Sequence, residues 1–269
     1  MANCFRQELE RAEKHIILNF RQTSSQTLVD AAYYFCKFQF GSEQFWAKIG
    51  QLDFGALSIS QLSRLSLALV MNNQPMQLEM TATLFKEILR KMDPKEATGS
   101  DAFMLCMAIG RGAGRKFGVD DIPQYSNVIY TLYTVVAHNI DSFNLQQLNK
   151  IAMFFSGRQT TEHVPTEFWT ESLEKGLGDY LVSLEQYRDD LDAKEFIADI
   201  SKCLVAMALK GLASPHFVAQ VEEVILPDCP SLDQKTQENL LFFLESTAPS
   251  RQSPLTKQIL AALDSAPSL

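Results

Sequence analysis

The stretch from Gly110 to Gly118 carries the residues that come nearest to a chemical motif. It contains four glycines, two arginines and a lysine. A Walker-type phosphate loop needs Gly-Lys followed by Ser or Thr, because that hydroxyl binds magnesium, but here Gly114 is followed by Arg-Lys-Phe. A dinucleotide fingerprint needs a preceding strand and another glycine spacing. Two interpretations stay open: a mobile connection between two helices, which we favour, or a basic loop that touches RNA phosphate or an acidic protein surface.

Other residue types that support catalysis or metal binding are scattered. The four histidines are isolated, and no H-E-x-x-H or G-x-S-x-G motif occurs. The acidic cluster Asp189–Asp192 lacks the glycine and the distal glutamate of a calcium loop, which favours a solvated turn with helix-capping roles. Cys36, Cys106 and Cys203 lie in apolar segments and are interpreted as small buried hydrophobic residues in a reducing compartment. We therefore expect no catalytic residue, metal or cofactor, and no enzyme.

Composition and charge narrow the class of protein further. Of the 269 residues, 46% are apolar, which is enough for a sizeable core, and the 12 glycines and 10 prolines are few for an all-β chain. The sequence has no apolar run long enough to cross a membrane, so we expect no membrane insertion. Residues 1–118 carry 14 Lys/Arg and 11 Asp/Glu, whereas residues 119–269 carry 10 and 21. An acidic surface repels phosphate, so the second part is a poor candidate for nucleic-acid binding.

Apolar residues recur at intervals of three and four, which is typical of amphipathic helices. A serine pair, Ser24-Ser25, is suited to cap one of these helices, and Asp93-Pro94 is suited to end another. The N-terminus shows neither a secretory signal nor a good organelle transit pattern. The first helices are expected over Phe5–Phe20, after Ser24-Ser25 and through Phe35, around Phe45-Trp46, from Ser60 through Leu69, and over Met80–Met92.

A two-helix unit recurs along the chain. Its first helix carries an apolar, polar, then apolar-small pattern, with Leu28, Leu62, Leu148 and Ile197 in corresponding positions 34, 86 and 49 residues apart. The interval of 86 residues fits two units, the second of them formed by Phe103–Ile109 and Tyr125–Ile140. The second helix of two units begins with a pair of aromatic residues, and Trp46 and Trp169 in these pairs are expected to be buried. Small residues in the first helices allow close helix approach: Ala32, Ser66, Ala152 and Ser201.

Repeating helix pairs predict an all-α fold, an α-solenoid of stacked antiparallel pairs with about five to six repeats. A non-repetitive helical bundle is the alternative. We expect one helical-repeat domain over residues 1–245 and a C-terminal helix or tail over 246–269, which would form an atypical capping unit.

Three segments resemble one repeat of the octotricopeptide/heptatricopeptide class, which includes the helical repeats of FAST-kinase-like and RAP-domain proteins of organelles. They are Ser24–Phe35 followed by Phe45–Ile49, Ile59–Ala68, and Leu145–Phe155. The resemblance implies a mitochondrial protein connected with RNA metabolism or the ribosome, with a cytoplasmic location as the alternative. The chain departs from that class in its acidic net charge of −8 and in the lack of an evident RAP-type module at its C-terminus.

These features favour a non-enzymatic scaffold or adaptor that binds other protein subunits of a larger complex, such as a mitochondrial RNA-processing assembly or ribosome. Direct RNA binding is the first alternative, and an accessory subunit of another organellar complex such as a respiratory enzyme is the second. The candidate contacts to a partner or to RNA are basic residues of the first part of the chain: Lys37, Arg64, Arg111, Arg115 and Lys116.

Overall fold

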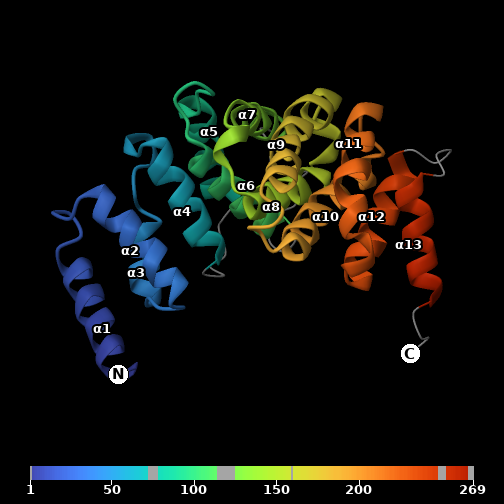
Figure 1. Ribbon diagram of the computed structural model, residues 1–269. Helices are drawn as coiled ribbons and strands as arrows, with labels where there is room; N and C mark the ends of the chain where they lie inside the picture. Colours follow the sequence, from blue (N-terminus) through green and yellow to red (C-terminus); the bar gives the residue numbers. More distant parts are fainter. Residues whose placement is uncertain (1, 72–77, 114–124, 159, 248–252, 266–269) are drawn as a thin grey trace. The chain divides into compact units, whose positions relative to one another are not determined.

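The computed structural model describes residues 2–71, 78–113, 125–158, 160–247 and 253–265 (Figure 1). This part of the chain consists of helices and their connections and contains no β-strand. The prediction of an all-α fold of stacked helix pairs is confirmed. The chain divides into two compact units, Met1–His138 and Asn139–Leu269, and each is described by itself. None of the described helices is long and apolar enough to span a membrane.

The first unit contains α1 (Ala2–Leu18), α2 (Ser25–Lys37), α3 (Glu43–Ile49), a 3₁₀ turn (Phe54–Ala56), α4 (Ile59–Met71), α5 (Leu78–Lys91), α6 (Gly99–Ala113) and α7 (Tyr125–His138). Helices α2, α4 and α6 form one row, in which α4 packs against both neighbours (Figure 1). We call these the first-layer helices. Each is followed by a second-layer helix, α3, α5 or α7, and α1 packs against α3 as a further second-layer helix.

The second unit repeats this arrangement with α8 (Leu145–Ser156), α9 (Glu174–Gln186), α10 (Ala193–Lys210), α11 (Pro215–Ile225), α12 (Gln234–Thr247) and α13 (Pro254–Ser265). Its first-layer helices are α8, α10 and α12, and α10 packs against both of the others. The second layer contains α9, α11 and α13. A π-helical turn, Phe168–Leu173, leads into α9 and carries the aromatic pair Phe168-Trp169.

A polar cap begins each first-layer helix, and it marks the repeat in the sequence. The cap side chain accepts a hydrogen bond from the backbone N–H three residues further on, which satisfies a donor that the helix itself leaves free. Ser58 caps α4, with Gln61 N at 3.2 Å from its Oγ, so the expectation that Ser60 opens this helix is off by two residues. The six caps are Ser24, Ser58, Thr98, Asn144, Asp192 and Asp233.

The residues predicted to fill the interior do so. Trp46 and Trp169 are 4% and 0% exposed, which confirms their predicted burial. The small residues Ala32, Ser66, Ala152 and Ser201 are all buried, and Ser201 lies where α10 approaches α12. The same close approach explains why cross-repeat hydrogen bonds recur at separations of about one repeat, such as 34 residues for Arg64 and Asp30 and 38 for Asn239 and Ser201.

Candidate partner interface on the first unit

The predicted contact residues fall on different parts of the first unit. Lys37 is the last residue of α2, Arg64 lies in the middle of α4, and Arg111 lies in the last turn of α6. Arg115 and Lys116 lie outside the described residues. Helix α6 runs through Gly110 to Ala113, so the first part of the glycine-rich stretch is helix and not the expected connection.

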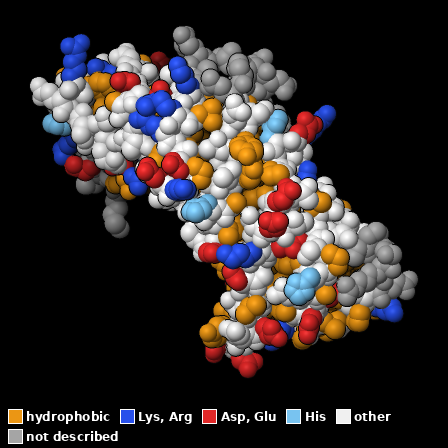
Figure 2. Space-filling model, turned by 90° about the horizontal axis from the view of Figure 1, so that it is seen from above, with side chains coloured by type: hydrophobic (Ala, Val, Ile, Leu, Met, Phe, Trp, Pro, Cys, Tyr) orange, Lys and Arg blue, Asp and Glu red, His pale blue; other side chains and the backbone are white. Residues whose placement is uncertain are grey.

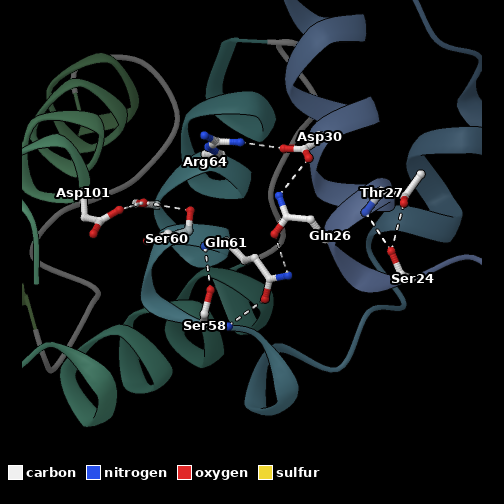
Figure 3. A network of polar contacts seen from close by, with 10 residues as sticks. Ser24, Gln26, Thr27, Asp30, Ser58, Ser60, Gln61, Arg64 and Asp101 are labelled. Carbon is white, nitrogen blue, oxygen red and sulfur yellow. Dashed lines mark hydrogen bonds and ion pairs between the residues drawn. The ribbon is translucent and has the colours of Figure 1, made fainter. Parts of the chain in front are cut away.

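Arg64 serves the packing of α2 against α4. Its Nη1 lies 2.6 Å from Asp30 Oδ1, and the other oxygen of Asp30 accepts from Gln26 Nε2 at 2.8 Å (Figure 3). Gln26 Oε1 in turn accepts from Gln61 Nε2 of α4 at 3.1 Å. The charge of Arg64 is therefore matched by a carboxylate across the repeat boundary, which reduces its value for attracting phosphate.

The same kind of contact joins α4 to α6. The carboxylate of Asp101 is 3% exposed, and its Oδ1 lies 3.3 Å from Ser63 Oγ of α4. Its other oxygen accepts from the backbone N–H and the hydroxyl of Thr98, at 3.2 and 2.7 Å. These hydrogen bonds offset the cost of burying a carboxylate. Asp101 is thus a structural residue that caps α6 and fixes its register on α4.

Lys37 lies in a group of exposed aromatic residues at the end of α2. Its Nζ is 4.6 Å from the ring centre of Tyr33 and 5.9 Å from that of Tyr34, within the range of cation–π attraction. Phe38, the next residue, packs edge to face against Phe5 of α1 with ring centres 4.9 Å apart. Phe5, Tyr34 and Phe38 are 49%, 53% and 52% exposed. We call these five residues the aromatic patch: Phe5, Tyr33, Tyr34, Lys37 and Phe38.

The prediction named only Lys37 of this patch. A signal for the rest was present in the run Tyr33-Tyr34-Phe35-Cys36-Lys37-Phe38, because a helix with one buried face cannot cover so many consecutive large residues. Phe35 and Cys36 take the buried positions, and Tyr34 and Phe38 are left outside.

Arg111 adds a second positive charge near the end of α2. Burial raises the pKa of the Cys36 thiol, and the charges of Arg111 and Lys37 act against that rise. Arg111 is exposed and makes no ion pair with a described residue. Counted from the helix caps, Lys37 and Arg111 occupy the same position, 13 residues after Ser24 and after Thr98. Lys37 and Arg111 are thus equivalent cations of α2 and α6, which lie on either side of α4 in the row.

The remaining chemistry of the described residues is structural. Cys36, Cys106, Cys203 and Cys229 are buried free thiols, as predicted for the first three. Burial raises the pKa values of Cys106 and Cys203 far above the ordinary thiol value, so neither is a reactive thiolate. Asp192 caps α10, and Asp189 and Asp190 are exposed, as expected for a solvated turn. No three His, Cys, Asp or Glu side chains in the described ranges are grouped to hold a metal ion.

The face drawn in Figure 2 does not present a phosphate-binding stripe. On the face shown in Figure 2, acidic and basic side chains lie interspersed among hydrophobic ones, and the coloured residues form no continuous basic stripe. The fold and this surface define an all-α protein of stacked helix pairs with an exposed aromatic patch. No protein-family model and no curated protein matches the sequence.

Proposed function

We propose that this chain is a non-enzymatic helical-repeat scaffold or adaptor that binds a protein partner through the aromatic patch, as a subunit of a multi-protein complex. The observation that supports this function is the grouping of Phe5, Tyr34 and Phe38, each about half exposed, around Lys37. Aromatic side chains are enriched in the cores of protein–protein interfaces, and contiguous exposed apolar patches mark such sites.

The energetics favour an aromatic contact of this kind. Covering one half-exposed aromatic side chain removes on the order of 100 Å² of apolar surface from water, about 2–3 kcal/mol at roughly 25 cal/mol per Å². Three such side chains supply enough to offset part of the cost of association, and the lysine at their edge contributes orientation more than affinity.

The complex that we propose is a mitochondrial RNA-processing assembly or a ribosome. This choice rests on the resemblance of the first-layer segments to octotricopeptide/heptatricopeptide repeats. A respiratory or other organellar complex, or a cytoplasmic one, would use the same surface in the same way.

Direct RNA binding is the second candidate, and the aromatic patch is also the observation that favours it. Bases stack on aromatic side chains, and exposed cations beside them attract the backbone. Lys37 and Arg111 could serve this role, whereas Arg64 is neutralised by Asp30. We favour a protein partner because two cations are few against a chain with a net charge of −8.

The test is affinity purification of the tagged chain, followed by mass spectrometry. The variant Tyr34→Ser/Phe38→Ser removes the patch, and Leu18→Ser/Tyr130→Ser is the matched control, because both residues are exposed in the same unit, at 74% and 60%. We expect the wild type and the control to co-purify the same partner proteins. The patch variant should lose these proteins, and nuclease treatment should not release them from the wild type. Partners released by nuclease would favour the RNA candidate, and partners kept by the patch variant would exclude the patch.

A further inference from the structure

In the rows of first-layer helices, contacts to the preceding helix recur at equivalent sequence positions. In α4, Gln61 and Arg64 face the preceding helix α2, and in α6 Asp101 faces α4. In α12, Asn239 bonds Ser201 of the preceding α10 at 3.2 Å. Counted from the cap, these residues stand at positions 3 and 6. Position 6 is shared, because Asp30 at position 6 of α2 bonds Arg64 of the following helix α4. The stripe of positions 3, 7 and 10 of a first-layer helix is the one that meets the helix before it.

In α4, α6 and α12 this stripe is covered, whereas in α10 the residues at positions 7 and 10 are Asp199 and Lys202, and Lys202 is exposed. The residues at positions 7 and 10 are Leu65 and Ala68 in α4, which are both 0% exposed. They are Leu105 and Ala108 in α6, at 0% and 2%, and Leu240 and Phe243 in α12, both at 0%.

The first helix of the row carries the same stripe without a cover. In α2 the equivalent residues are Ala31 and Tyr34, and the stripe continues four residues later to Phe38. Tyr34 and Phe38 are more than half exposed. The outermost helices of a repeat protein need a polar outer face for solubility. This one is apolar and aromatic, so the aromatic patch lies where a preceding first-layer helix would pack.

The packing of helix α1 gives further evidence for where a first-layer helix preceding α2 would lie. Helix α1 belongs to the second layer, because its Glu13 accepts from the backbone N–H of Ser42, the cap of α3, at 2.5 Å. In the second unit, Glu174 of α9 does the same for Ser214, the cap of α11. Helices α3, α5, α7 and α13 each pack beside the first-layer helix of their own pair. By the same arrangement, the position beside α1 and before α2 is that of a first-layer helix. Phe5 of α1 borders the position from one side and Phe38 of α2 from the other.

We propose that this position is a docking site for an amphipathic α-helix of a partner protein, which packs on α2 as one more first-layer helix. The proposal rests on the proposed function and names the partner's chemistry. The partner helix needs an apolar stripe at intervals of three and four residues to cover Ala31, Tyr34 and Phe38. It needs a carboxylate beside that stripe, because Lys37 has no ion pair with a described residue.

The experiment is photo-cross-linking in cells from the full chain carrying Tyr34→benzoylphenylalanine. The control carries the same amino acid at Tyr130, which is exposed on α7. The captured segment is sequenced and synthesised as a peptide, and its binding to the purified chain is measured together with its circular dichroism. We expect a segment captured from position 34 only, with a helical apolar stripe and a flanking Asp or Glu, that gains helix on binding. Tyr34→Ser/Phe38→Ser should weaken that binding by about a hundredfold. Lys37→Glu should weaken it roughly fivefold, and Lys86→Glu on α5 should leave it unchanged.

The remaining outcomes overturn the inference, and they separate it from the proposed function. A captured protein segment that binds as an extended strand would refute the docking site for a helix. It would leave the proposed protein binding through the aromatic patch intact. Capture of RNA would refute both. Capture of this chain itself, with a molar mass that rises with concentration in light scattering, would make the occupant a second copy. The cross-linker at position 34 could also capture nothing while partner proteins that depend on the aromatic patch still co-purify. That result would refute the docking site for a helix.

Discussion

At the scale of single residues, the two tryptophans show how tightly the repeat is packed. Trp46 and Trp169 are fully enclosed, and each lies edge to face against the phenylalanine before it, with ring centres 5.1 and 5.4 Å apart. Neither indole N–H has a hydrogen-bond acceptor among the described residues. Gly41 lies beside Trp46 with φ +108°, and a Cβ there would come within 2.6 Å of the indole nitrogen. Packing alone therefore holds these side chains, without a polar anchor.

We expect Trp169→Ala to destabilise the second unit by about 3–5 kcal/mol, because it removes a large, fully buried side chain and leaves a cavity. Urea unfolding of the full chain would measure the loss as a shift of the transition of that unit. Tyr187→Ala is the control, since Tyr187 is 56% exposed in the same unit. Equal tolerance at both positions would contradict the buried role of the aromatic pair.

Asp233 gives a prediction about pH. Its pKa is lowered from the ordinary value, first by the hydrogen bond from the Thr236 backbone N–H, whose nitrogen lies 2.9 Å from Oδ1. A carboxyl group with a lowered pKa in the folded state stabilises the protein above its unfolded pKa, and that contribution is lost as the pH falls through the folded value. Asp233→Ala should therefore cost about 1 kcal/mol near neutral pH and progressively less below about pH 4. Thermal unfolding of both proteins from pH 7 to pH 3 would measure this difference, and a constant gap would contradict it.

At the scale of elements, hydrogen bonds between second-layer helices lock successive pairs together. Glu174 of α9 is 9% exposed, and its oxygens accept from the backbone N–H and the hydroxyl of Ser214, at 2.5 and 2.7 Å. The carboxylate also lies at the positive end of the α11 dipole. The bond from Ser42 to Glu13 has the same form in the first unit. A carboxylate of one pair thus holds the start of the second helix in the next pair.

Removing the hydrogen bonds between Glu174 and Ser214 should destabilise the start of α11. We expect Glu174→Gln, which keeps the shape and loses the charge, to cost about 1–2 kcal/mol. Hydrogen exchange should become faster at the first amides of α11, while α8 keeps its protection. Glu171→Gln, at an exposed position three residues earlier, is the matched control. Unchanged exchange in α11 would show that the bond contributes nothing to the seating of the helix.

The sequence predicted the helices well and the contacts between repeats poorly, and the reason is physical. Helix periodicity is local, so Leu28, Leu62, Leu148 and Ile197 marked four first-layer helices correctly. The Arg64–Asp30 pair depends on how one helix lies along another, which no local pattern determines. The run from Tyr33 to Phe38 signals that some of its large residues are exposed, but which of them are left uncovered depends on α2 being the first helix of its row. The π-helical turn at Phe168–Leu173 has no distinct sequence signal.

At the scale of the whole chain, charge separates the two units and bears on RNA binding. Residues 1–138 carry 14 Lys/Arg and 13 Asp/Glu, whereas residues 139–269 carry 10 and 19. The first unit is nearly neutral and the second strongly acidic. Nucleic-acid affinity comes mainly from neutralised phosphates, so neither unit has the charge of a dedicated RNA clamp.

We therefore expect weak RNA binding by the isolated chain, with a Kd near or above about 10⁻⁴ M at physiological salt and a steep dependence on salt. The triple change Arg111→Ala/Arg115→Ala/Lys116→Ala removes the densest basic cluster in the sequence. Lys194→Ala/Lys202→Ala/Lys235→Ala removes three exposed lysines of the second unit and serves as the control. Fluorescence anisotropy with single-stranded RNA at several salt concentrations should show small and similar losses for both variants, because a few cations contribute to a non-specific interaction according to their number. A nanomolar, sequence-dependent complex that the first variant loses and the control keeps would reverse the ranking, because it would require a localised RNA site around Arg111.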